Sequence, residues 1–185
     1  MNNPVQWRPP FYNDYDDEMV YRPFAVGSRL YAVGFEKLST LHDLTRKGGD
    51  ILKAHPTFKF PAGGVWTVMF DEIDPLVMDF KGFRHIVHPG IIGGRVMFNV
   101  ACIIFDHYTI SRTGAYLFSA ATDPHHLRQT DLAALYDRAL GLNGHPKSRL
   151  FRTLFNGWQA YSNSASGGRE YVVTTEDYAS TTHPR

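Results

Sequence analysis

The sequence predicts an α+β fold in which a mixed, mostly antiparallel sheet is flanked by helices. The first observation is the region of residues 83–142, where a strand, a glycine-rich turn, a helix, a strand and a second helix follow one another. The second is a set of short segments rich in β-branched and aromatic residues on either side of it. A chain of 185 residues, 43% of them hydrophobic, has the size of one domain. We therefore expect a single domain over residues 1–185, with a loose arm over about residues 1–17 and a frayed tail over about residues 179–185.

The segment before the central region predicts strands on both sides of a helical stretch. Alternating apolar residues on either side of Gly27 are typical of two strands that meet at a turn. The next stretch has helical spacing from about Ser39 and is interrupted at Gly48 and Gly49. The expected elements are strands at residues 19–26 and 28–35, a helix within residues 36–54, a loop at residues 56–64, and strands at residues 65–70, 76–80 and 83–87.

The centre of the chain predicts a buried helix that follows a glycine-rich turn. The turn, residues 88–95, contains three glycines, and residues 96–110 then repeat apolar side chains at helical spacing. Glycine lets a backbone approach a ligand closely, and the first N–H groups of a helix are unpaired, so such a turn can hold a phosphate. The remaining expected elements are a strand at residues 114–121, a helix at residues 132–141, a mobile loop at residues 163–168, a helical turn within residues 146–155 and a last strand at residues 169–175.

Charge and cysteine content restrict the partners and the compartment. A net charge of +1 and a sequence pI near 7.9 give no bulk attraction to nucleic acid or to an anionic membrane. No stretch approaches about 18 consecutive apolar residues, and the first residues lack the pattern of a signal peptide. The single cysteine, Cys102, lies in an apolar run, which fits a reducing compartment. We expect a cytoplasmic protein that does not enter a membrane.

The order of elements over residues 65–142 resembles the GCN5-related N-acetyltransferase family. The resemblance rests on a central strand that leads into a glycine-rich turn and a helix, then a strand, and then a helix with the sequence Ala134-Leu135-Tyr136-Asp137-Arg138-Ala139-Leu140-Gly141. Residues 19–54 are compatible with the opening strand and helix of that family. In the family, backbone N–H groups of the turn bind the pyrophosphate of acetyl-coenzyme A, and the tyrosine of the later helix can protonate the leaving thiolate.

The resemblance implies an acyl-CoA-dependent N-acyltransferase. Acetyl-CoA or another acyl-CoA would be the cofactor, and the acceptor would be an amine on a small molecule, a protein or a tRNA. Tyr136 would protonate the thiolate, and Asp79 or His85 would take the proton from the amine. Asp71, Glu72 and Asp74 also flank the central strands and are further candidate bases. The residues that would hold the pyrophosphate are Gly90, Ile92, Gly93, Gly94 and Arg95.

A second hypothesis is a non-enzymatic binding or inhibitory module of a mobile genetic element, such as a phage or a plasmid. Basic residues in and after the predicted helix at residues 132–141 are interleaved with aromatic ones; they are Arg138, Lys147, Arg149 and Arg152, with Phe151, Phe155 and Trp158. Arginine and aromatic side chains together hold phosphates and stack on bases. Arg149, Arg152 and Trp158 are therefore candidate contacts to nucleic acid, although a solvated helix face explains the same residues more simply.

A third and less favoured hypothesis is metal-dependent chemistry. Five residues supply ligand types for zinc or iron: Asp106, His107, Asp123, His125 and His126. None of them has the spacing of a dedicated metal motif, such as two histidines one helical turn apart with an adjacent glutamate. The sequence therefore assigns no metal-ligating residue.

Overall fold

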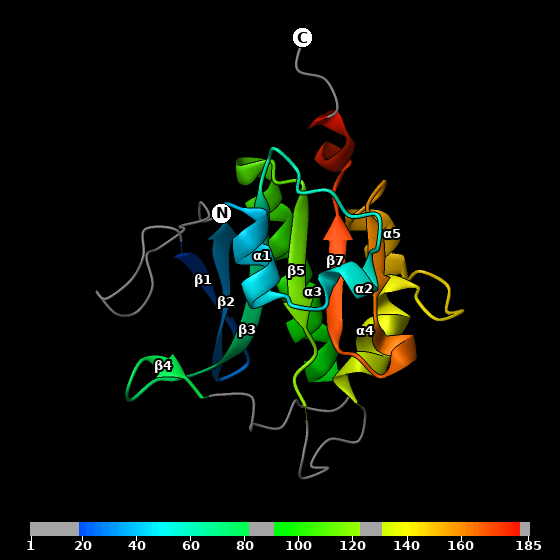
Figure 1. Ribbon diagram of the computed structural model, residues 1–185. Coiled ribbons are helices and arrows are strands. Elements are labelled where there is room, and N and C mark those ends of the chain that lie inside the picture. The colour runs from blue at the N-terminus through cyan, green and yellow to red at the C-terminus, as the bar shows by residue number, and fades with distance from the viewer. Residues whose placement is uncertain (1–18, 82–90, 123–130, 182–185) are drawn as a thin grey trace.

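The computed structural model describes residues 19–81, 91–122 and 131–181, and a mixed sheet forms its centre (Figure 1). The strands lie in the order β1-β2-β3-β5-β7-β6, and β4 pairs with β3. Their bounds are β1 Met19–Val26, β2 Arg29–Leu38, β3 Val65–Asp74, β4 Asp79–Phe80, β5 Ala115–Ser119, β6 Gln159–Ser162 and β7 Glu170–Thr174. The described pairs are antiparallel except for β3 with β5, which is parallel. The predicted α+β class, with a mixed and mostly antiparallel sheet, is confirmed.

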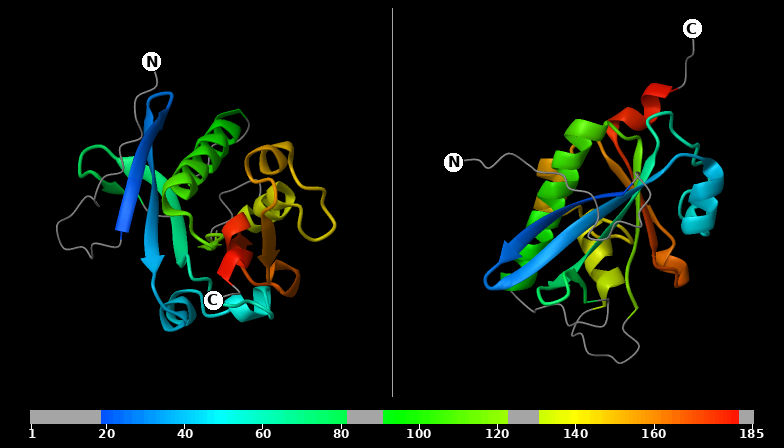
Figure 2. Two further views of the ribbon diagram at one scale, coloured as in Figure 1. Left: turned by 90° about the horizontal axis from the view of Figure 1, so that it is seen from above. Right: turned by 90° about the vertical axis from the view of Figure 1, so that its left-hand side faces the viewer.

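Helices cover both faces of this sheet (Figures 1 and 2). One face carries α3, α4 and α5, and the other carries the short helices α1 and α2. The helix bounds are α1 Leu41–Lys47, α2 Ile51–Ala54, α3 Ile91–Ser111, α4 Leu132–Leu140 and α5 Arg149–Leu154, with short 3-10 helices at Ser164–Ser166 and Glu176–Thr181. Each strand contributes side chains to the packed layers on both faces of the sheet, because successive side chains of a strand point to opposite faces.

The central helix is confirmed, but it is longer and more exposed than predicted. It begins at Ile91, so part of the predicted turn over residues 88–95 is helical. Val96, Val100 and Ile103 are buried against the sheet, whereas Phe98 is 53% exposed and Ile110 is 65% exposed. The prediction of a mostly buried helix is wrong on this outer face, because a sheet covers only one side of a helix that lies on it.

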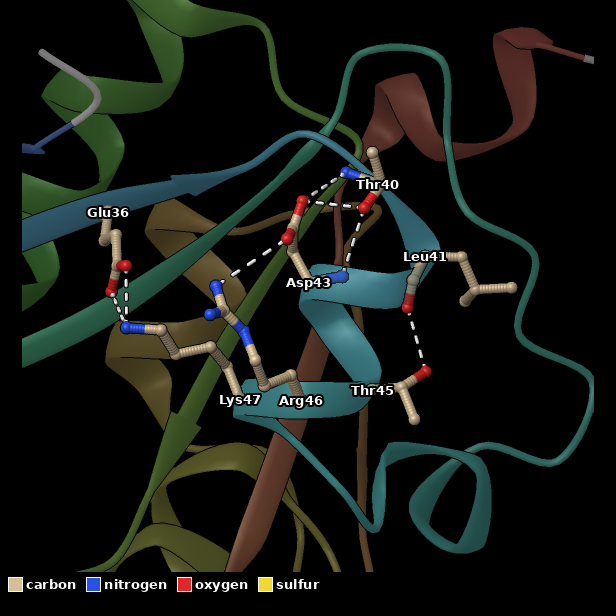
Figure 3. Close-up of polar contacts among 7 residues, drawn as sticks. All are labelled: Glu36, Thr40, Leu41, Asp43, Thr45, Arg46 and Lys47. Carbon is tan, nitrogen blue, oxygen red and sulfur yellow. Dashed lines mark hydrogen bonds and ion pairs between the residues drawn. The ribbon is translucent and has the colours of Figure 1, made fainter. Parts of the chain in front are cut away.

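The predicted helical stretch over residues 36–54 divides into the end of β2 and two short helices. A capping box starts α1: the Thr40 hydroxyl accepts from the Asp43 N–H at 3.1 Å, and the Asp43 carboxylate accepts from the Thr40 N–H at 3.1 Å (Figure 3). The helix ends at Gly48, where a Cβ would lie 2.5 Å from the Leu117 side chain of β5. Glycine at this position therefore lets the end of α1 rest on the sheet.

Several boundaries differ from the sequence predictions. β3 continues to Asp74, so residues 71–74 are a strand and the turn comes later. β6 was not predicted, and the stretch at residues 163–168 is a hydrogen-bonded turn in which the Gly168 N–H donates to the Asn163 carbonyl at 3.0 Å. The strand predicted at residues 83–87 and the arm at residues 1–17 lie outside the described residues. In the part of the chain that the structure describes, the longest helix falls short of the apolar character that crossing a membrane requires.

Candidate functional site

The parallel strands β3 and β5 pair over a short distance and then separate. Their ladder joins Val65 to Ala115, Trp66 to Tyr116 and Thr67 to Leu117. β3 continues for seven residues beyond Thr67, and none of these pairs with β5. A cavity of about 380 Å³ lies along the separating strands, and this volume is within the range of small-molecule sites.

The cavity extends between the two strands, as well as lying on one face of the sheet. Consecutive residues of β3, from Thr67 to Glu72, line it, and so do consecutive residues of β5, from Tyr116 to Ser119. Side chains of a strand alternate between faces, so a cavity that touches every residue in turn reaches both faces. On the α1 face its wall includes Glu36 and Lys47, whose carboxylate and ammonium are 2.7 Å apart (Figure 3).

On the other face of the sheet, residues of α3, α4 and α5 line the cavity. The α3 side chains that line it lie in the second to fourth turns of the helix; they are Val96, Met97, Val100, Ala101 and Ile104. Figure 1 shows that α3 begins near the end of the sheet at which β3 and β5 finish. The unpaired N–H groups of the first helical turn therefore lie at the same end of the molecule as the gap between the strands.

Tyr136 lies on the wall of this cavity. It belongs to α4, is 7% exposed and packs edge-on against Phe118 and Tyr171, with ring centroids 5.5 Å away in both pairs. The helix places it there because Leu132, Ala133 and Tyr136 form one buried stripe, and Gly141 ends the helix in the left-handed conformation. The structure thus brings the sequence-predicted tyrosine to the cavity.

The glycine-rich stretch lies partly in the first turn of α3. Gly93 and Gly94 are helical, and a Cβ added at Gly94 would meet no atom within 4 Å. Arg95 is exposed. Gly90 and the side chain of Ile92 lie outside the described residues. Of the residues predicted to bind the pyrophosphate, those that the structure describes are therefore two glycines without side chains and one exposed arginine at the start of α3.

The candidate bases are not brought together at this site. Asp79 lies in β4, where its carboxylate accepts from the Phe80 N–H at 2.7 Å, and it is not among the described residues that line the cavity. His85 lies outside the described residues. Of the carboxylates near the central strands, Asp71 and Glu72 line the cavity instead. The reason is that β3 extends past Asp71, which carries Asp79 beyond the gap.

Glu72 is a buried carboxylate with two cationic partners. Lys81 Nζ donates to one oxygen at 2.7 Å and Arg29 Nη1 to the other at 3.1 Å. Burial acts to raise its pKa, but hydrogen bonds and charge from Lys81 and Arg29 outweigh this and hold the pKa of Glu72 below its ordinary value. A carboxylate in this state is a hydrogen-bond acceptor and a fixed negative charge; it is a weak proton acceptor.

The described residues contain no group of three or more metal-ligating side chains. Asp106 pairs with Arg22 at 2.7 Å, whereas the neighbouring His107 is buried and stacks on Phe35 at a centroid distance of 4.1 Å. Asp106 and His107 therefore lie in different environments, one in an ion pair and the other in the aromatic core. Asp123, His125 and His126 lie outside the described residues.

The basic and aromatic residues near the C-terminal helix do not form one surface. Arg149 and Arg152 are exposed, but Trp158 is 2% exposed and stacks on Tyr116. Phe151 and Phe155 are buried in the same core. The prediction that Trp158 contacts nucleic acid is wrong for this fold, because a ring that fills the core cannot stack on a base.

Comparisons of the chain with protein-family models, with curated proteins and with solved structures found no match. From the sequence, Glu72 is one of several candidate carboxylates, and no sequence pattern indicates the gap between β3 and β5. The number of residues over which two parallel strands pair depends on the elements that pack against them. The periodicity of the sequence within one strand does not indicate it. The only indication in the sequence is that residues 65–74 can form a strand longer than the one predicted, so β3 extends past the end of β5.

Proposed function

We propose that the chain is an N-acyltransferase that binds an acyl-CoA in the gap between β3 and β5 and transfers the acyl group to an amine. The observation that carries the proposal is the cavity between separating parallel strands, which α3 lines with side chains of its second to fourth turns, after the glycine-containing first turn. A long, narrow thioester arm fits between two strands that offer unpaired ladder positions. The start of α3 is suited to the phosphates, because its N–H groups and dipole favour an anion.

The residues of the chain that fit this group are those at the start of α3 and those on the cavity wall. Gly93 and Gly94 leave the backbone of the first turn uncovered, and Arg95 adds a positive charge beside it. The apolar side chains of α3 and β5 exclude water from the thioester. When bound, the acyl-CoA would supply an activated carbonyl carbon.

Transfer needs one proton delivered and one removed. With an acyl-CoA bound, the Tyr136 phenol would donate its proton to the sulfur that leaves as the amine nitrogen replaces it on the carbonyl carbon. The nitrogen loses one proton to water or to a base, and the tyrosinate regains one from solvent, so the protons balance. Glu72 serves the amine by accepting a hydrogen bond, because its lowered pKa makes it a poor base.

Calorimetric titration of CoA and acetyl-CoA tests the proposal, with a size series at one position. We expect the parent to bind, Gly94→Ala to bind more weakly and Gly94→Leu more weakly still, because each side chain covers more of the helix backbone. Neither variant should unfold the protein, since the position is open and both residues favour a helix by up to about 1 kcal/mol over glycine.

Gly49→Ala is the matched control. It replaces a glycine between α1 and α2, where a Cβ would make only an ordinary contact of 3.7 Å, and it should leave CoA affinity unchanged. No heat with CoA in the parent, or equal affinity across the Gly94 series, would count against an acyl-CoA site at the start of α3.

A further inference from the structure

The cavity extends past the gap between β3 and β5 into the space between α3 and α5. These two helices lie side by side on one face of the sheet (Figure 2). Apolar side chains line this part of the cavity, which we call the α3–α5 chamber; they are Ile104 of α3, Leu150, Phe151 and Phe155 at α5, and Trp158 just after it. Ser148 also lines the cavity here, but its hydroxyl caps α5 by accepting from the Phe151 N–H at 3.1 Å.

The depth of the cavity suits a hydrocarbon chain of medium length. Residues of α3 line it from Val96 in the second turn to Ile104 in the fourth. The axial rise over this part of the helix is about 12 Å. The whole cavity measures about 380 Å³, whereas an apolar cavity of about 150 Å³ is enough to hold a benzene ring. An acetyl group would therefore fill only a small part of it.

An apolar space of this kind is stabilised by an apolar occupant. Protein interiors are close-packed, and atoms that line an unfilled space lose dispersion contacts on that side. Water is a poor substitute, because a buried water needs several polar partners and the side chains that line the α3–α5 chamber present mostly hydrocarbon. The chamber therefore favours a hydrocarbon group of a ligand over water.

The proposed proton donor lines the same cavity. Tyr136 contributes to the wall from α4, beside Phe118 of β5 and Leu140 of α4. A thioester whose sulfur lies at Tyr136 thus has its acyl group in a continuous cavity that reaches the α3–α5 chamber. This arrangement connects the chamber to the acyl side of the thioester.

We propose that the α3–α5 chamber binds the acyl chain of the thioester, and that this acyl group is a medium-length hydrocarbon chain, longer than acetyl; the assignment rests on the proposed function and specifies its acyl donor. Each methylene buried in the chamber contributes about fourfold in affinity, or about 0.8 kcal/mol. Ala101 limits the room for the chain, because it is a small buried residue of α3 on the cavity wall.

Calorimetric titration with thioesters of N-acetylcysteamine tests the chamber without turnover and without phosphates. The series carries acetyl, butanoyl, hexanoyl and octanoyl groups. We expect the affinity of the parent to rise by about fourfold for each added methylene as far as hexanoyl. Equal affinity across the series would overturn the proposal. Octanoate that binds as tightly as the octanoyl thioester would overturn it as well, because the cavity would then take a free acid.

Ala101→Leu locates the chain in the cavity. It should weaken binding of the octanoyl thioester by about tenfold or more and leave the acetyl thioester unaffected, because the added carbons occupy the room of several methylenes. The matched control is Ala134→Leu, the same change at an exposed position of α4 that is not among the described residues lining the cavity, and it should bind like the parent. Equal octanoyl affinity in a folded Ala101→Leu and the parent would overturn the proposal. The length series in the parent decides the question even if Ala101→Leu fails to fold.

Titration of CoA, acetyl-CoA and octanoyl-CoA in the same preparations separates the two proposals. Heat with CoA, together with equal affinity for acetyl-CoA and octanoyl-CoA, would leave the acyl-CoA site standing and overturn the acyl-chain chamber. Length-dependent binding of the N-acetylcysteamine thioesters that Ala101→Leu weakens, but no heat with CoA, would support the chamber and count against the acyl-CoA site at the start of α3.

Discussion

The two ends of the β3–β5 pair differ in how their buried polar groups are satisfied. At the closed end, where Val65–Thr67 pair with Ala115–Leu117, His107 Nδ1 lies 2.8 Å from the Tyr116 hydroxyl and the His107 ring stacks on Phe35. At the open end, beyond Thr67 and Leu117, the Tyr31 hydroxyl has no partner among the described residues and a cavity takes the place of packed side chains.

This difference separates the end of the strand pair that stabilises the fold from the end that has room for a ligand. A packed interior pairs its polar groups internally, and each pair contributes to stability. Where two parallel strands separate, the buried Tyr31 hydroxyl lacks such a partner among the described residues. Changes at the closed end should therefore alter stability, and changes at the open end should alter binding or turnover.

The largest expected effect is the response of the closed end to acid. Burial lowers the pKa of His107 to about 4 from the ordinary value of about 6.5. The unfolded chain therefore takes up a proton that the folded chain resists, so stability falls as the pH is lowered from about 6.5 to about 4. This difference in pKa between the unfolded and the folded chain corresponds to a loss of about 3 kcal/mol in the free energy of unfolding.

Urea denaturation at a series of pH values in this window measures that loss. His107→Gln keeps a side chain that can hydrogen-bond to Tyr116 but cannot be protonated, so its free energy of unfolding should vary less with pH. A parent and a variant with parallel pH curves would show that His107 does not carry this dependence.

At the open end, Tyr136→Phe should lower acyl transfer about a hundredfold, the usual scale for losing a general acid, with CoA affinity little changed. The ring contacts with Phe118 and Tyr171 remain, so the fold should persist. Turnover is measured with acetyl-CoA and an amine, and the control is Tyr161→Phe, which removes the hydroxyl of a tyrosine of β6 that is not among the described residues lining the cavity. Activity equal to that of the parent would remove Tyr136 from the proton transfer.

Two buried tyrosines give a direct stability comparison. The Tyr171 hydroxyl lies 3.0 Å from the Ala133 carbonyl oxygen and 3.1 Å from an Asp137 oxygen. Tyr171→Phe should lower the free energy of unfolding by about 1–3 kcal/mol, because buried acceptors lose their donor. Tyr31→Phe should leave the free energy of unfolding unchanged or raise it, because no internal hydrogen bond is lost.

The urea midpoints of both variants at neutral pH, without ligand, decide this comparison. A loss of stability in Tyr31→Phe as large as that in Tyr171→Phe would mean that the Tyr31 hydroxyl has an internal partner.

The smallest expected effect is at the α1 side of the cavity. The Lys47–Glu36 pair is partly exposed, so Lys47→Met should change the free energy of unfolding by less than about 1 kcal/mol, and added salt should shrink the difference. The same measurement in low and high salt checks this. A larger change that salt does not affect would indicate that the Lys47 stem packs in the cavity wall.

Most elements of the fold could be predicted from local patterns. The turn at Gly27, the strand that begins at Val65, and α4 with its end at Gly141 follow from periodicity and from glycine in the left-handed conformation. These features depend on the residues within each element, so the sequence by itself determined them. The α+β class followed from their order.

The site depended on the tertiary structure. Whether Gly93 and Gly94 lie before the helix or in its first turn was decided by where α3 begins at Ile91. Tyr31 and Glu72 are 41 positions apart in the chain and become neighbours only through the register of β2 and β3. Trp158 was a surface candidate until packing against Tyr116 placed it in the core.

The sequence by itself determined most of the strands and helices, β6 excepted, and it placed a tyrosine in the buried stripe of α4, because these depend on contacts within a few residues. Only the tertiary structure decided that β3 and β5 separate after three pairs. The pairing of β3 with β5 joins segments about 50 positions apart in the chain, and contacts between such distant segments leave no local pattern.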